Sequence, residues 1–147
     1  MAAWYPWVVL VHVSCAIVFV GAVVFEVAVL EGLHAKFEPD VMHRIEAAIM
    51  ERARKFMPVV VVLLFLSGFF LFDYRCNGFA CVATTGGKLL LVKVALAFAV
   101  LAVFARAIWA GLHGGMDPCR FRNTHRIILA MMVAIVVIAK LMFSGVF

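Results

Sequence analysis

The first long apolar segment decides the fold, and from Trp4 to Leu30 it reads WYPWVVLVHVSCAIVFVGAVVFEVAVL. It exceeds the roughly 20 residues that a helix needs to cross a bilayer. It also contains one histidine, His12, and one carboxylate, Glu26, which helical geometry places on nearly the same face about 21 Å apart. A charged side chain deep in hydrocarbon costs about 2.5–3.5 kcal/mol or more, so both residues require partners.

The composition of the whole chain indicates a membrane protein. Of the 147 residues, 67% are apolar and only 14% are charged. This leaves too little polar surface for a soluble globule of this size. The chain starts MAAW, with no basic residue, and its apolar run is longer than that of a signal peptide. We therefore expect a permanent first helix.

Four apolar segments are long enough to span a bilayer as helices. They predict an all-α fold, in which a single domain over residues 1–147 forms an antiparallel four-helix bundle in the membrane. The helices are expected at about 4–32, 45–73, 88–112 and 124–146. Pro58 suits the first turn of the second helix, but this helix can also begin earlier, within Ile45–Phe56, and extend beyond the membrane.

The distribution of basic residues predicts the orientation of the helices. The connections at 34–56 and 114–126 carry five and three Lys or Arg residues, which is eight of the thirteen in the chain. Short connections rich in Lys and Arg stay in the cytoplasm. Both termini and the Asp73–Lys88 loop are thus predicted to face the periplasm, in a bacterial inner membrane. The net charge of +5 then reflects topology, and no basic pattern indicates nucleic-acid binding.

The four cysteines fall on different sides of the predicted membrane. Cys76 and Cys81 lie in the outer loop, where an oxidising periplasm permits a disulfide, but spacing alone leaves both a disulfide and free thiols open. Cys119 lies on the inner side and is expected to be a free thiol. Cys15 follows His12 by three residues, so the two share a helix face. This allows half of a metal site or, alternatively, a small apolar side chain at a helix contact.

Three potentially cationic residues are predicted to lie at one depth in the membrane. His12 is about eight residues into the first helix, Lys93 about five into the third, and Lys140 seven from the carboxyl end. At 1.5 Å per residue, all three lie roughly 8–12 Å below the outer surface. Lysines near a helix end can extend to the headgroups, whereas an imidazole reaches less far. The alternative for His12 is a structural hydrogen bond to a neighbouring helix.

Haem b is a cofactor that fits this layer. A neutral imidazole supplies an axial ligand to iron, and basic residues near the surface pair with the propionates. His12 is then the iron ligand, and Lys93 and Lys140 are cofactor-binding candidates in the same layer. Arg75 and Lys88 are the candidates at the surface. Four-helix bundles commonly form such sites from side chains on facing helices.

Several stretches resemble known families. The stretch IMERARKFMP at Ile49–Pro58, followed in the apolar helix by Ser67–Gly68, resembles the start of the second helix in the HemJ-type protoporphyrinogen IX oxidases. The stretch GKLLLVK at Gly87–Lys93 is also similar to the membrane domain of the CopD copper-resistance proteins, which have a related four-helix pattern. The resemblance covers most of the chain and implies a four-helix membrane protein.

The resemblance to the HemJ-type oxidases extends to the predicted site residues. HVSCAIVFVG from His12, KVAL from Lys93 and VVIAK ending at Lys140 resemble the first, third and fourth helices of that family. The resemblance implies that His12 and Lys93 are the functional pair and are associated with haem b. The chain departs from the family at Phe25–Val27 and Asn123–Arg126, which is typical of a divergent relative.

The residues and the resemblance lead to two hypotheses. The first is a haem b-binding redox protein of the inner membrane, similar to the porphyrinogen oxidases, that passes electrons from a porphyrinogen or another small substrate to a quinone or a partner protein. The second is a CopD-type copper-handling or transport protein without enzymatic activity, with His12, Cys15 and Met142 as soft ligands. Both hypotheses imply contact with the lipid bilayer and are compatible with a homodimer.

Overall fold

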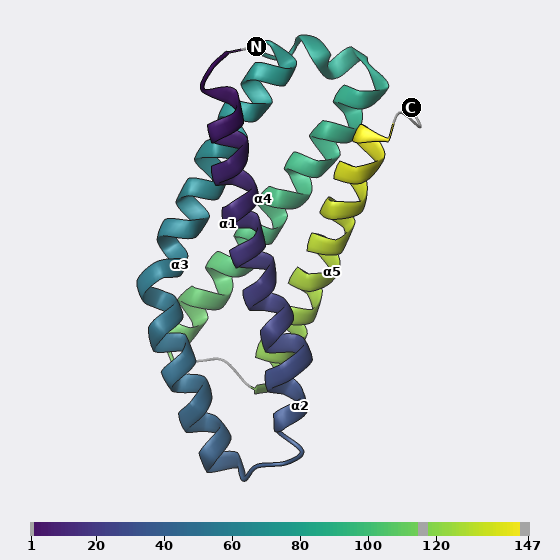
Figure 1. The fold of residues 1–147 in the computed structure, drawn as a ribbon. Coiled ribbons are helices and arrows are strands. Elements are labelled where there is room, and N and C mark those ends of the chain that lie inside the picture. Colours follow the sequence, from purple (N-terminus) through teal and green to yellow (C-terminus); the bar gives the residue numbers. More distant parts are fainter. Residues whose placement is uncertain (1, 115–117, 145–147) are drawn as a thin grey trace. The chain divides into compact units, whose positions relative to one another are not determined.

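The structure is a computed structural model that describes residues 2–114 and 118–144, without the side chains of residues 118–121. Within these ranges the chain is helical and has no strand (Figure 1). Four of its helical segments are long and apolar enough to cross a membrane: Tyr5–Leu33, Pro39–Cys76, Thr85–Ala110 and Arg122–Phe143. This confirms the predicted all-α protein with four segments suited to a membrane. The chain divides into two compact units, the first ending at Tyr74 and the second beginning at Arg75.

The first unit starts with one nearly continuous helix. Its first part, α1, runs over Tyr5–Phe25 and has a proline in its first turn, where a missing N–H leaves no helical hydrogen bond unmade. A π-helical turn, η1, follows at Glu26–Leu30, and the short α2 completes the helix at Glu31–Leu33. The π-helical turn thus begins at the carboxylate of the apolar segment. Such turns often accompany functional sites.

The second long helix, α3, runs over Pro39–Cys76 and contains 38 residues. It begins before residue 45, the start that the sequence predicts, and Pro58 lies inside it rather than in its first turn. At 1.5 Å per residue, α3 is about 57 Å long, well beyond the ~30 Å thickness of a bilayer core. The helix therefore continues through its charged first half and begins earlier than either of the two alternative starts that the sequence predicts.

Side-chain contacts join the first helix and its flanking residues to α3 in a regular order. The contacts pair Trp4 with Tyr74, His12 with Ser67, and His34 with Glu46. From one contact to the next, the partner from the first helix has a higher residue number and the partner from α3 a lower one, so the first unit is a helical hairpin. The 2.8 Å contact between Nε2 of His34 and a carboxylate oxygen of Glu46 joins the end of the first helix to α3 near their connection.

The second unit contains two long helices and a short 3₁₀ helix. The 3₁₀ helix, η2, covers Ala80–Ala83, and the long helices are α4 at Thr85–Leu112 and α5 at Pro118–Phe143. The predicted end of the last helix near residue 146 lies outside the described residues. α4 and α5 pack against each other. Alanine recurs along α4, in VALAFAVLAVFARAIWA, and small residues let two helix backbones approach closely in a membrane.

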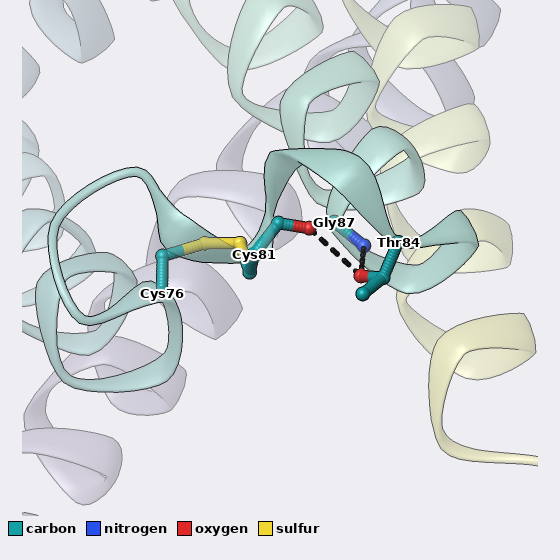
Figure 2. The surroundings of a disulfide bond; sticks show 4 residues. All are labelled: Cys76, Cys81, Thr84 and Gly87. Atoms are coloured by element: carbon teal, nitrogen blue, oxygen red, sulfur yellow. Dashed lines mark hydrogen bonds between the residues drawn. A yellow bond between two sulfur atoms is a disulfide. The ribbon is translucent and has the colours of Figure 1, made fainter.

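The turn between α3 and α4 is closed by a disulfide (Figure 2). Asn77 and Gly78 follow α3 with positive φ angles of 44° and 79°, the left-handed conformation that commonly terminates a helix. The chain therefore reverses, and Cys76 and Cys81, whose Cα atoms are 4.7 Å apart, form a disulfide across the turn. Of the two alternatives that the spacing leaves open, the structure has the disulfide.

Thr84 connects this turn to the start of α4 (Figure 2). Its hydroxyl donates to the Cys81 carbonyl oxygen at 2.7 Å and accepts from the Gly87 N–H at 3.0 Å. The second bond satisfies one of the backbone N–H groups that a helix start leaves unpaired. A Cβ atom at Gly87 would overlap the Cys81 carbonyl, so the close approach of the turn to α4 requires glycine at this position.

Candidate functional site around His12

His12 lies half-buried on α1, and its imidazole contacts α3. The ring atom Nδ1 is 3.1 Å from the carbonyl oxygen of Leu64 and 3.1 Å from the hydroxyl oxygen of Ser67. Because a carbonyl oxygen can only accept a hydrogen bond, Nδ1 carries the hydrogen. In the neutral ring the lone pair is therefore on Nε2, which is a nitrogen able to coordinate a metal.

Ser67 is buried in α3 and provides an acceptor for His12. Its hydroxyl oxygen is 2.6 Å from the carbonyl oxygen of Leu63 and 3.0 Å from that of Leu64, a bonding pattern typical of serine inside a helix. The hydroxyl hydrogen is donated to these carbonyls, so the hydroxyl oxygen accepts from Nδ1. A histidine that ligates a metal commonly donates its other N–H to such an acceptor, which fixes the tautomer and the orientation of the ring.

Gly68 leaves the space that the imidazole occupies. A Cβ atom at Gly68 would lie 3.1 Å from Cε1 and 3.5 Å from Nδ1 of His12. The Ser67–Gly68 pair thus supplies both an acceptor for the ring and room beside it. The sequence shows this pair in an apolar helix but does not connect it with His12, from which Ser67 is separated by 55 positions.

The ligands of the copper hypothesis are distributed over both units. Cys15 is a buried free cysteine on α1, three positions after His12, and Met142 is half-buried on α5. Among the described residues, no three His, Cys, Asp or Glu side chains form a group that could hold a metal ion. His12 and Cys15 belong to the first unit and Met142 to the second, so the copper ligand set stays a prediction.

The predicted lysines of the site all belong to the second unit. Lys93 is half-buried on α4, inside the segment that is apolar enough to span a membrane. Lys140 is exposed in the last turn of α5, where the helix dipole stabilises a positive charge. Lys88 is exposed in the first turn of α4. Because His12 belongs to the first unit, its association with these lysines stays a prediction.

Arg75 makes a contact that the sequence does not predict. It lies exposed in the last turn of α3, and its guanidinium carbon is 5.2 Å from the centre of the Phe143 ring. This is within the range of a cation–π interaction. The contact joins two residues far apart in sequence, and no local pattern indicates it.

No protein-family model matches this chain, and neither a curated protein nor a solved structure matches it. The resemblance to the HemJ-type oxidases and the CopD proteins therefore rests on the quoted stretches of sequence. The hydrogen bonds of His12 are independent of that resemblance, and they make His12 the best-defined candidate residue.

Proposed function

We propose that this chain is a haem b-binding membrane redox protein in which His12 would hold the haem iron through Nε2. The observation that carries the proposal is the double anchoring of Nδ1 by the Leu64 carbonyl and the Ser67 hydroxyl. This anchoring presents one tautomer of the imidazole in one orientation, as a metal ligand requires. A purely structural imidazole can make the same two bonds, so the decisive experiment measures cofactor binding directly.

The other predicted site residues have distinct roles in this proposal. Bound haem b supplies one-electron chemistry. Lys93, half-buried in an apolar helix, acts as a second ligand or a polar partner of the cofactor, and Lys140 belongs to the same predicted layer. Arg75 and Lys88, both exposed at helix ends, bind the propionates, because surface cations attract carboxylates. The role of Lys93 is supported by its predicted depth and by the family resemblance.

The reaction that we propose is electron transfer from a small reduced substrate to a quinone or a partner protein. A porphyrinogen is the substrate class that the family resemblance supports, and its acidic groups would bind basic residues at the surface. The departures from the family at residues 25–27 and 123–126 favour a divergent specificity. The proposed activity is therefore that of a membrane oxidoreductase resembling the porphyrinogen oxidases.

We also infer that the turn between α3 and α4 faces the periplasm of a bacterial inner membrane. The disulfide between Cys76 and Cys81 supports this side, because disulfides persist in oxidising compartments. The basic residues concentrated in the other connections support the same orientation. Both termini would then lie on the periplasmic side of an antiparallel four-helix bundle.

A visible spectrum of the detergent-purified chain, recorded before and after dithionite, tests the proposal. We expect sharp reduced haem bands that disappear in His12→Ala and persist in His43→Ala, which removes an exposed histidine of α3. Ser67→Ala should retain haem but shift its reduction potential, because the ring loses one of its two acceptors. A colourless preparation with stoichiometric copper would refute the redox proposal and favour the CopD-type hypothesis.

A further inference from the structure

The charged first half of α3 meets its apolar second half just before Pro58. The basic residues Arg52, Arg54 and Lys55 are all exposed at this boundary. Lys55 forms an ion pair with Glu51 at 3.6 Å, but the two side chains are 68% and 74% exposed, and such pairs are weak. Arg52 and Arg54 form no ion pair within the part of the chain that the structure describes. Their charges are therefore available to an external anion.

A shallow, open groove begins one helical turn further along α3. It is lined only by apolar residues, which are Pro58, Val59, Val62 and Leu63. These residues form two pairs with i,i+4 spacing, so they lie on one face of the helix. The groove lies in the apolar second half of α3, and it is open to the surroundings.

Helical geometry aligns the basic residues with the groove. Arg54 precedes Pro58 by four residues, and Lys55 precedes Val59 by four, so the Cα atom of each basic residue is about 6 Å along the helix axis from that of a groove residue. Side chains on a helix lean towards its amino terminus, which in α3 is the charged end. The two cationic groups are thus directed to the polar side of the boundary, and the groove extends to the apolar side.

We propose that this face of α3 binds one anionic phospholipid, with its phosphate at Arg54 and Lys55 and an acyl chain in the groove. Charge complementarity favours an anionic headgroup, because each basic residue near a membrane surface strengthens binding to an anionic lipid by about five-fold. A zwitterionic lipid has no net charge and gains little from this attraction. The wholly apolar lining of the groove matches an acyl chain. The site is independent of haem binding.

Native mass spectrometry of the full chain in detergent tests the headgroup contact. The probes are phosphatidylglycerol and phosphatidylcholine with identical acyl chains, and wild type should retain more phosphatidylglycerol. Arg54→Gln should lower phosphatidylglycerol binding about five-fold and leave phosphatidylcholine binding unchanged. The matched control is Arg44→Gln, an exposed arginine on α3 about 15 Å further from the groove, which should bind like wild type.

A second variant tests the acyl-chain contact. Val62→Trp fills the groove without changing its polarity, so it should lower phosphatidylglycerol binding although Arg54 is intact. Circular dichroism confirms that each variant keeps its helices. The proposal is overturned if Arg44→Gln weakens binding as much as Arg54→Gln, since the attraction is then diffuse. It is also overturned if both lipids bind wild type equally, or if Val62→Trp binds like wild type.

Discussion

Replacing Gly68 with alanine should displace the imidazole of His12. The new Cβ atom would lie 3.1 Å from Cε1, closer than the roughly 3.5–4.0 Å at which two carbon atoms attract each other best. The ring must therefore move by a few tenths of an ångström. Its Nδ1 is already 3.1 Å from both acceptors, near the long end of the usual range, so any outward movement weakens both bonds.

Opposing terms determine the effect of Gly68→Ala on the free energy of unfolding. Replacing a glycine in a helix interior with alanine stabilises the helix by about 0.5–1 kcal/mol. Overpacking costs about 1–3 kcal/mol, and each weakened hydrogen bond costs up to about 0.5–1.5 kcal/mol. Gly21→Ala is the matched control, because Gly21 lies inside α1 and a Cβ there meets no atom within 4 Å. Gly68→Ala should therefore be less stable than Gly21→Ala by about 1–3 kcal/mol.

Unfolding of the detergent-solubilised variants by sodium dodecyl sulfate, followed by circular dichroism, measures this difference. If both substitutions raise stability equally, the ring of His12 does not lie beside Gly68 and the described site is wrong. In haem-loaded protein, Gly68→Ala should also change the visible spectrum, whereas Gly21→Ala should leave it unchanged.

Two further predictions concern the turn between α3 and α4. Without reductant, treatment with a thiol-alkylating reagent should leave Cys76 and Cys81 unmodified, as mass spectrometry can show. Replacing both cysteines with serine should lower the free energy of unfolding by about 2 kcal/mol, because the loop that the disulfide closes is short. Alkylation of the unreduced protein at either position would contradict the disulfide. Gly87→Ala should destabilise the protein by about 1–3 kcal/mol in the same unfolding assay, because the new Cβ overlaps the Cys81 carbonyl. Gly86→Ala is the control and should not destabilise it, because a Cβ there meets open space. Equal stabilities of the two variants would show that the turn does not approach α4.

The start of α3 illustrates a limit of hydropathy as a signal. The apolar run locates the part of the helix that is suited to a membrane, but it does not locate the first helical residue. The charged stretch from Pro39 to Phe56 is rich in good helix formers, so α3 continues through it. Pro58 removes one backbone hydrogen bond without ending the helix, although a proline often marks a boundary.

His12 is detectable in the sequence because a histidine is costly in an apolar segment, whatever its neighbours are. Its acceptors are not detectable in the same way. Leu64 and Ser67 lie on another helix, and only the pairing of the two helices brings them to 3.1 Å from Nδ1. The same reasoning applies to Gly68, whose missing side chain has meaning only once the ring is beside it.

The sequence by itself determined that this protein is helical, has four segments suited to a membrane and contains a polar residue that needs partners. These are local properties, because the transfer of about 20 residues into lipid depends on the residues themselves. Only the tertiary structure decided which atoms receive the Nδ1 hydrogen of His12 and that Cys76 pairs with Cys81. Hydrogen bonds and disulfides depend on distances of a few ångströms between residues that only the folded chain brings together.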